Sequence, residues 1–520
     1  MARYHDILVF CLLFILITYF SRRWWSRRSL SRVIPGPKDV SWTYGHLPQL
    51  LLTPEYGENE FQWQNKYGPV YSIQGCLGEP RLMISDPTTA KYIINSGVFV
   101  FGHSHQKIAN VLFGPGNVFL ATGDAHRHLR GIMNPWFSAK NVRTFLPIVE
   151  ETSRKNTETL ELVDRWESLN FAGSTVDVFP TLNDATLDIN GKAIFGHEFN
   201  SLEGQSEVAK IQRRLSDSVS SPSKFAQLMD AALPYIPDVV FRLALNLPME
   251  AARILRDYKR MTDELALDLA FQMRDAQAHE GFLSRFVDAS GLPDPGIGVH
   301  LRTTLIAGQD TTGATFGWIL YKLAQMPDYQ RDLRREIQTA GLGEHLDYKN
   351  LPLLNAIINE VLRMYCAFPL SERVASEDCI LPLSQPITTT TGSQMFDIPF
   401  KKGQCLYLAM AGHNRRVLIP SIWGPDAGDF RPSRWLEKEP RKGPALGPHP
   451  TGLTFLGGPG VCLGWRFAIL TLQVFVVTIV RKYILTLPEN DSVRPRLAIT
   501  LMPTTADGVR QLPLHIEPVT

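Results

Sequence analysis

The segment Phe455-Leu456-Gly457-Gly458-Pro459-Gly460-Val461-Cys462-Leu463-Gly464 sets a cysteine between a glycine-rich loop and an apolar stretch of strong helix propensity, from about Leu463 to Lys482. Glycines allow a backbone to turn sharply and to approach a flat ligand closely. A cysteine at the start of a helix faces unpaired N–H groups and the positive end of the helix dipole, and both favour the thiolate. Cys462 is therefore a candidate metal ligand, although a cysteine that is merely buried beside a loop is the commoner outcome for such a segment taken alone.

A second unusual segment, Ala307-Gly308-Gln309-Asp310-Thr311-Thr312, lies inside an apolar helix that we expect from about Gly296 to Gln325. A carboxylate within an apolar helix is costly unless it has a partner or a task. The Thr311 hydroxyl can donate a hydrogen bond back to the Ala307 carbonyl, and Gly308 can loosen the helix, so the segment can open a pocket for a small ligand. A satisfied polar kink in a core helix fits the same residues equally well.

The cysteine loop resembles the haem-binding loop of the cytochrome P450 family, Phe-x-x-Gly-x-Arg-x-Cys-x-Gly. Phe455, Gly458, Cys462 and Gly464 fit this pattern, whereas Gly460 stands where the family usually has an arginine that pairs with a haem propionate. The resemblance implies that Cys462 ligates the iron of haem b (iron protoporphyrin IX). It also implies that Phe455, Gly458 and Gly464 lie around the cofactor.

Other segments resemble the same family in its order and spacing. By this resemblance, Thr311 donates a hydrogen bond to bound dioxygen and Asp310 helps to relay protons. Glu360 and Arg363 share one helix face, and the family locks such a pair with a second arginine, here Arg434 in the loop FRPSRW. We expect these three residues to serve folding and assembly of the haem pocket rather than chemistry, because arginine suits a buried network with several donors.

Three basic side chains are candidates for binding the haem propionates. His126 and Arg130 lie on one helix face in the segment HRHLR, which resembles the family's Trp-x-x-x-Arg helix with histidine in place of tryptophan. Arg373 follows the Glu-Arg pair at the distance that the family has. Each side chain can bind a carboxylate, whereas a surface position is the commoner fate of a single cation.

Residues 1–33 are expected to form an N-terminal membrane anchor with a basic flank. Ile7 to Phe20 carry no charge, and the cluster SRRWWSRR that follows suits the cytosolic side of a bilayer, with its tryptophans in the headgroup belt. The apolar run is short for a transmembrane helix, and a cleaved secretory signal is the alternative, but no small-residue cleavage site follows it. We therefore predict a single-pass protein of the endoplasmic reticulum membrane whose catalytic domain faces the cytosol.

Residues 34–520 are expected to form a single haem-binding domain of mainly α class, a cytochrome P450 fold with a helical body and a minor β-sheet part. Helical patterns fit Val142–Val163, Met249–Glu280 and Leu354–Tyr365, the segments PVYSIQG and PRLMISDP are typical of strands, and loop signals return between about 376 and 460. A net charge of +2 without a long basic run gives no electrostatic support for nucleic-acid binding. The six cysteines include no CxxC pair, so neither a disulfide framework nor a structural zinc site is expected.

The family resemblance implies a monooxygenase, an oxidoreductase of EC 1.14 type, that inserts one oxygen atom from dioxygen into a lipophilic small molecule. It also implies a membrane-bound NADPH–cytochrome P450 reductase as the partner that supplies electrons. Substrate-pocket candidates are Ala307, Phe368 and Leu370, because most pockets of this kind are apolar. The pattern resembles fungal microsomal members that act on terpenoids in secondary metabolism, while a fatty-acid or aromatic hydroxylase and a non-catalytic haem- or lipid-binding relative are the alternatives.

Overall fold

The computed structural model describes residues 33–38, 40–170, 175–219, 223–247, 249–275, 294–341, 346–415, 422–438 and 445–519. In these ranges the chain is mainly helical with small sheets, as predicted. The predicted membrane anchor lies outside the described residues except for its last position. Within the described ranges, none of the helices combines the length and the apolar character that spanning a bilayer requires.

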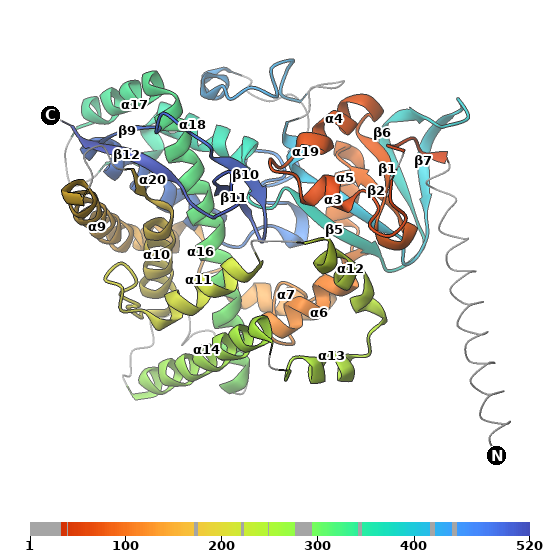
Figure 1. The fold of residues 1–520 in the computed structure, drawn as a ribbon, viewed down its shortest axis with the longest axis horizontal. Coiled ribbons are helices and arrows are strands. Elements are labelled where there is room, and N and C mark those ends of the chain that lie inside the picture. Colours follow the sequence, from red (N-terminus) through yellow and green to blue (C-terminus); the bar gives the residue numbers. More distant parts are fainter. Residues whose placement is uncertain are drawn as a thin grey trace.

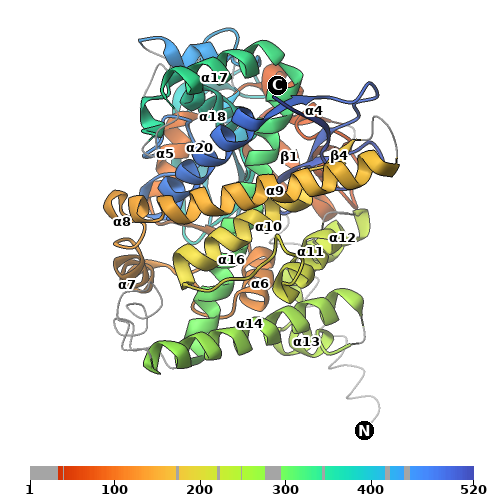
Figure 2. The ribbon, with the colours of Figure 1, turned by 90° about the vertical axis from the view of Figure 1, so that its left-hand side faces the viewer.

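The long helix α16 (Asp294–Gln325) runs through the centre of the molecule, with the long helices Leu146–Asn170 and Glu250–Asp275 on one side and the main sheet on the other (Figure 1). The α-helices before it are α3 (Leu47–Leu51), α4 (Glu58–Tyr67), α5 (Pro87–Asn95), α6 (His103–Leu112), α7 (Gly123–Met133), α8 (Ala139–Thr144), α9 (Leu146–Asn170), α10 (Phe179–Asn190), α11 (Glu207–Val219), α12 (Lys224–Ala232), α13 (Asp238–Ala244) and α14 (Glu250–Asp275). Those after it are α17 (Pro327–Thr339), α18 (Pro352–Met364), α19 (Met410–Asn414) and α20 (Trp465–Lys482). Figure 2 shows α9 crossing the helical side of the molecule, with α14 below it.

Close packing of α10 against α16 depends on glycines in α16. A Cβ atom at Gly308 would lie 2.5 Å from Nδ2 of Asn190, and one at Gly313 would lie 2.5 Å from Oδ1 of Asn183. Both distances are too short for a real Cβ atom, so a larger residue at either position would have to displace an asparagine side chain of α10. The glycine of the Ala307–Thr312 segment therefore serves helix packing. The helix continues through it without interruption, so the expected loosening at Gly308 is wrong.

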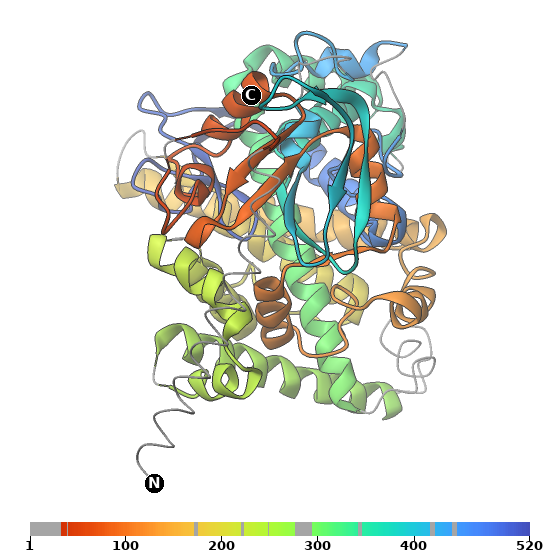
Figure 3. The same ribbon diagram turned by 90° about the vertical axis from the view of Figure 1, so that its right-hand side faces the viewer.

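The main sheet lies on the opposite side of α16 (Figure 3). It has the strand order β1-β2-β8-β5-β3, in which β2 and β8 are parallel and the other neighbours are antiparallel. Its strands are β1 (Val70–Gln74), β2 (Pro80–Ile84), β3 (Phe99–Phe101), β5 (Leu370–Ala375) and β8 (Cys405–Ala409). The smaller sheets pair β6 (Cys379–Thr388) with β7 (Gln394–Phe400), β10 (Arg494–Leu497) with β11 (Leu501–Thr504), and β12 (Pro513–Pro518) with both β4 (Val176–Asp177) and β9 (Tyr483–Thr486).

Most of the predicted helices and strands are confirmed, with shifted ends. The helix expected over Val142–Val163 is divided into α8 and α9, because Pro147 begins a new helix, where its missing N–H costs nothing. The loop assignment between about 376 and 460 is wrong for β6, β7 and β8. Pro382 and Pro386 argued against a strand there, but β6 tolerates them in a two-stranded sheet, with an irregular register between Pro382 and Ile387.

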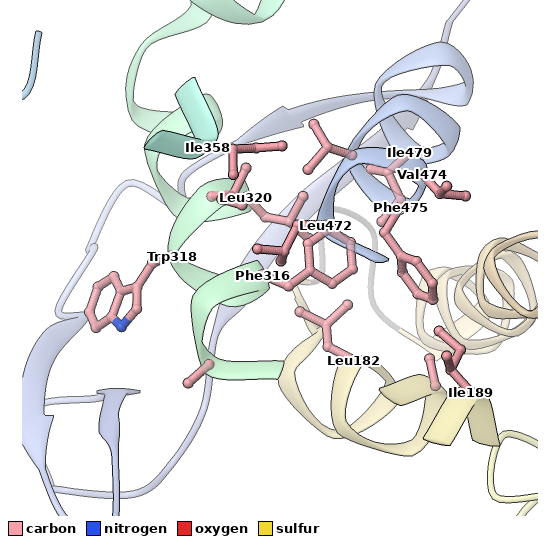
Figure 4. Close-up of a cluster of buried hydrophobic side chains, with 14 of the residues drawn as sticks. Leu182, Ile189, Phe316, Trp318, Leu320, Ile358, Leu472, Val474, Phe475 and Ile479 are labelled. Atoms are coloured by element: carbon pink, nitrogen blue, oxygen red, sulfur yellow. The ribbon is translucent and has the colours of Figure 1, made fainter. Parts of the chain in front are cut away.

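The largest apolar core lies where α10, α16, α18 and α20 meet (Figure 4). Phe316 of α16 and Phe475 of α20 contact each other edge to face, with ring centres 5.1 Å apart. Leu182 of α10 and Leu472 of α20 lie beside this pair (Figure 4). This core fixes α20 relative to α16, and so it fixes the loop before α20 relative to the same helix.

We predict that Phe475→Ala lowers the free energy of unfolding by about 3–5 kcal/mol, because it removes a buried aromatic ring and leaves a cavity. Denaturant unfolding followed by circular dichroism measures this change. Phe396→Ala is the matched control, since the Phe396 side chain is 70% exposed and its loss should cost under about 0.5 kcal/mol. Equal effects of the two substitutions would contradict the placement of this core.

Candidate functional site around Cys462 and Asp310

The cysteine loop folds back on itself directly before α20. The Cys462 amide donates a hydrogen bond to the Phe455 carbonyl over 2.9 Å, and Gly464 is the N-cap of α20. At Gly458 the backbone has φ +59°, and a Cβ there would lie 2.7 Å from the carbonyl oxygen of Ile94. The glycine is therefore required at this position, whereas Gly460 faces open space and has no positive φ.

The Cys462 side chain is exposed and lines an open cavity of about 670 Å³. Other side chains that line this cavity include Arg130, Phe137, Leu446, Leu463, Trp465 and Arg466. The guanidinium of Arg130 also donates a hydrogen bond to the carbonyl oxygen of Val461 over 2.8 Å. The structure thus brings one of the three predicted propionate ligands next to the predicted iron ligand.

Burial raises the pKa of the Cys462 thiol. The N–H of Gly464 and the positive charge of Arg130 act in the opposite direction but are weaker. The helix end therefore acts on the thiol in the expected direction, but burial outweighs it. A thiolate at this depth needs a cation beside it, and a transition metal ion is a partner of the kind that thiolate prefers.

One face of α16 is left uncovered near its middle, although the helix runs through the centre of the molecule. Ala307 is exposed, and Thr304, Gly308 and Thr311 are half-buried, whereas the adjoining positions Ile306, Gln309, Asp310 and Thr312 are buried. The Thr311 hydroxyl donates to the Ala307 carbonyl over 2.7 Å. An uncovered stripe inside a protein body, together with a thiol that faces a cavity, fits a flat, largely apolar cofactor such as haem.

Asp310 lies beside this uncovered face, on an adjoining side of the same helix, and is buried there. The hydroxyl of Ser216, on α11, donates to Oδ2 of Asp310 over 3.0 Å. Burial raises the pKa of Asp310, while the charge of Arg510 and the Ser216 hydrogen bond lower it. The costly carboxylate in the apolar helix therefore has a partner, which no sequence motif had indicated.

A polar chamber of about 180 Å³ lies beside Asp310. Its wall includes Gln212 and Gln309, and in the described part of the chain neither side-chain atom of Gln212 nor Oε1 of Gln309 has a hydrogen-bond partner. The ion pairs Arg213–Asp184, at 2.8 Å, and Arg510–Asp217, at 2.9 Å, also belong to its lining. The volume holds a few water molecules at about 30 Å³ each, and water satisfies buried amides of this kind.

Glu360 of α18 is the centre of a buried charge network. Its Oε1 lies 2.8 Å from Arg363 and 3.0 Å from Arg434, and all three side chains are at most 1% exposed. The Trp435 indole also donates to Glu360, over 2.9 Å. Burial opposes the ionisation of Glu360, but the hydrogen bond and charge of Arg363, aided by Arg434, hold its pKa below the usual range.

Hydrogen bonds connect this network to the cysteine loop. Arg363 donates to the carbonyl of Asn414 over 2.9 Å, and the Asn414 side chain donates to the Thr454 hydroxyl over 3.0 Å. Thr454 in turn donates to the carbonyl of Leu362 over 2.8 Å. The residue before Phe455 is therefore tied to α18, so the network positions the loop that carries the cysteine.

The remaining predicted site residues do not line the cavity at Cys462. His126 lies near Arg130 on α7, where burial and the charge of Arg130 lower its pKa. Arg373 lies on β5 with its guanidinium carbon 3.8 Å from the ring centre of Phe101, and burial lowers its pKa to about 10. Of the substrate-pocket candidates on the segment before and into β5, Phe368 is 42% exposed and Leu370 is half-buried.

Comparison of the sequence with known proteins assigns the chain to a family. The sequence profile named Cytochrome P450 matches residues 35–507. The chain is 29% identical to cytochrome P450 monooxygenase 91 of Postia placenta over 95% of this chain and 97% of that protein. It is 27% identical to cytochrome P450 monooxygenase claP of Ampulloclitocybe clavipes, over 95% of this chain and 93% of that protein.

We predict that Glu360→Gln lowers the free energy of unfolding by about 3–5 kcal/mol at neutral pH, because two buried guanidinium groups lose their shared carboxylate. The folded-state pKa of Glu360 is depressed, so its contribution is present above its ordinary value of 4.5 and is lost as the pH falls below that value. Denaturant unfolding at several pH values measures both effects.

The matched control for this substitution is Glu437→Gln. Glu437 pairs with Arg431 at 2.5 Å, but its side chain is 51% exposed, so the change should cost under about 1 kcal/mol. A Glu360→Gln protein as stable as the control would remove the assigned role of the network.

Proposed function

The chain belongs to the cytochrome P450 family and is a cytochrome P450 monooxygenase of EC 1.14 type, and from this premise we propose that it oxidises a lipophilic substrate at haem b ligated by Cys462. The observation that carries the proposal is the Cys462 thiol at the wall of an open cavity of about 670 Å³, a wall that also holds Arg130. Arg130 is suited to bind a propionate carboxylate. His126 and Arg373 are the further candidates for this task, and Phe455, Gly458 and Gly464 shape the loop around the ligand.

When bound, haem activates dioxygen for insertion of one oxygen atom into the substrate, with electrons that NADPH delivers through a reductase partner. The protein's own contribution is to hold groups and to move protons. The folded loop, closed by the hydrogen bond from the Cys462 amide to the Phe455 carbonyl, would hold the Cys462 sulfur in place as the ligand of the iron. The Arg130 charge and the Gly464 N–H tune this sulfur by lowering its pKa.

Proton supply is the proposed task of Asp310 and Thr311. Thr311 lies on the uncovered face of α16, where its hydroxyl donates a hydrogen bond to a ligand once the bond to Ala307 is released. Asp310, the preceding residue, lies against Ser216 and the polar chamber. Water in that chamber gives Asp310 a route for protons that does not pass through the substrate cavity, which keeps bulk water away from the reacting atoms.

The proposed substrate is a terpenoid of fungal secondary metabolism. Its support is the apolar character of the pocket candidates Ala307, Phe368 and Leu370 and the similarity to fungal monooxygenases. The printed names of those relatives give no substrate, and a fatty-acid or aromatic hydroxylase is the second candidate. Product analysis after co-expression with a reductase and candidate terpene synthases separates the two. We also propose that residues 1–33 anchor the domain to the endoplasmic reticulum membrane, facing the cytosol, in reach of the reductase.

We predict that Cys462→Ala abolishes the strongly red-shifted Soret band of the reduced, carbon monoxide-treated protein, because that band requires a thiolate ligand. Activity should fall to background, while the circular dichroism spectrum keeps most of its helix signal. Cys405→Ala is the control, since Cys405 is buried in β8 and should leave the band intact. A wild-type protein that binds haem without this band would favour the non-catalytic relative and would end the present proposal.

We predict that Asp310→Asn slows turnover by about 100-fold, the lower range for a lost proton donor, without changing the carbon monoxide spectrum. Because the slow step would then be proton delivery, the solvent deuterium isotope effect on turnover should rise as well. Asp491→Asn is the matched control, because Asp491 also accepts a hydrogen bond from an α16 residue, Tyr321, at 2.8 Å. Normal turnover in Asp310→Asn would exclude this residue from the proton route.

A further inference from the structure

Arg302 is a buried cation on α16 that the proposed mechanism does not use. Its side chain is 2% exposed. The guanidinium donates from Nε and Nη2 to the carbonyl oxygen of Phe113, over 3.2 Å and 3.0 Å, and pairs through Nη1 with Asp263 of α14. One side chain thus joins α16, α14 and the segment that follows α6.

The segment after α6 is seated directly on α16 at this point. Gly114 has φ +104°, and a Cβ there would lie 2.8 Å from Cγ2 of Val299 and 3.2 Å from Nη2 of Arg302. The turn beyond it is held by Asn117, whose amide donates to the Gly114 carbonyl over 2.7 Å and whose Oδ1 accepts from the Leu120 amide over 3.0 Å. The turn is therefore held by its own hydrogen bonds and by Arg302, which fixes where it lies and limits its opening.

A row of aromatic rings leads from Phe113, whose carbonyl accepts from Arg302, to Arg373. We call the contacts of Arg302 with Phe113 and Asp263 the clamp. The ring centre of Phe113 lies 5.9 Å from that of Phe119, and Phe119 stacks on Phe101 at 4.5 Å. Arg373 lies over the other partner of this stack, 3.8 Å from the ring centre of Phe101. Phe119 is 45% exposed although it is a large apolar side chain in contact with two other rings.

The clamp lies close to the uncovered face of α16. Leu112 and Phe113 pack against a buried cluster from α11, α14 and α16 that includes Ile306, the neighbour of exposed Ala307. The aromatic row therefore extends from a buried cluster next to Ala307 to the proposed propionate ligand Arg373, and it includes the exposed ring of Phe119. Under the proposed function, a shift of this segment would change the apolar surface that a substrate meets.

We propose that Arg302 is a positioning residue that sets the shape of the substrate chamber by clamping residues 113–119 to α16 and α14. The inference rests on the proposed function and deepens it. A buried arginine adds little net stability compared with an apolar side chain of similar volume. The role of Arg302 is therefore best explained by the single geometry that its fixed donors impose on the segment. Arg302 touches no reacting atom and acts only through the loop and its aromatic rings.

The test compares Arg302→Met with wild type in the full-length holoenzyme. Hydrogen exchange of the amides of Leu120 and Ala121, which bond to Asn117, should speed up by about tenfold, with no change elsewhere. Spectral titration with imidazole and with clotrimazole should show an unchanged Kd for the small ligand. The Kd ratio of the bulky to the small ligand should change at least about tenfold, equivalent to about 1.4 kcal/mol.

Arg334→Met is the matched control. Arg334 also donates to backbone carbonyl groups, those of Val480 at 2.9 Å and Tyr483 at 2.6 Å, but it lies on α17 away from the site. It should leave both the local exchange and the ligand ratio at wild-type values. Arg302→Lys and Asp263→Asn, which keep part of the clamp, should show the same changes in smaller size.

Unchanged local exchange or an unchanged ligand ratio in Arg302→Met overturns the inference. If Arg302→Met does not fold, the two milder variants decide, and wild-type behaviour in both overturns it. The carbon monoxide spectrum distinguishes this result from failure of the proposed function. If Arg302→Met keeps the red-shifted band but shows no change in selectivity, only the inference about Arg302 is refuted. If the wild type lacks the band, the haem-thiolate assignment itself is refuted.

Discussion

The arrangement of the site depends on one electrostatic constraint, which is the cost of a negative charge on the Cys462 sulfur. Burial raises the pKa of the Cys462 thiol more than the helix end and Arg130 lower it. An anionic ligand at this position is therefore stable only against a cation, and the surrounding backbone must hold the sulfur still so that the cation finds it in place. Two local features hold the sulfur in place. The Cys462 amide donates a hydrogen bond to the Phe455 carbonyl, and the backbone at Gly458 has a positive φ that requires glycine.

A buried network of charged side chains also fixes the position of the cysteine loop. The Glu360–Arg363–Arg434 network is fully buried, and it reaches the loop through Asn414 and Thr454. Because a buried carboxylate shared by two guanidinium groups tolerates only a narrow range of geometries, it specifies one position for α18 and for the segment that precedes the cysteine. The apolar contact of Phe316 with Phe475 specifies the position of α20 on the other side of the loop.

The sequence predicted the parts of this site that have a local pattern, because a fixed spacing puts such residues together in any fold that forms. The cysteine loop, the Glu360–Arg363 pair and the Thr311–Ala307 hydrogen bond are of this type. Ser216 and Arg302 could not be found in this way, since their partners Asp310 and Phe113 are remote in sequence and meet them only in the folded chain. The strands β6, β7 and β8 were missed because prolines and turn residues in this region are typical of loops. The strand pairing that stabilises them forms only in the folded sheet.

The central helix carries two environments on adjoining faces, and its sequence is constrained by both. Near Ala307 and Thr311 one face is uncovered, whereas the neighbouring Asp310 lies against Ser216 and a polar chamber. A helix with this arrangement cannot show a simple apolar stripe, because each side needs small or polar residues at a different register. Under the proposed function, adjacent residues of this one helix would keep the proton supply and the substrate close in space but in separate compartments. Any shift of α16 along its axis would disturb both at once, which explains why glycine contacts with α10 and the Arg302 clamp hold the helix on either side of this segment.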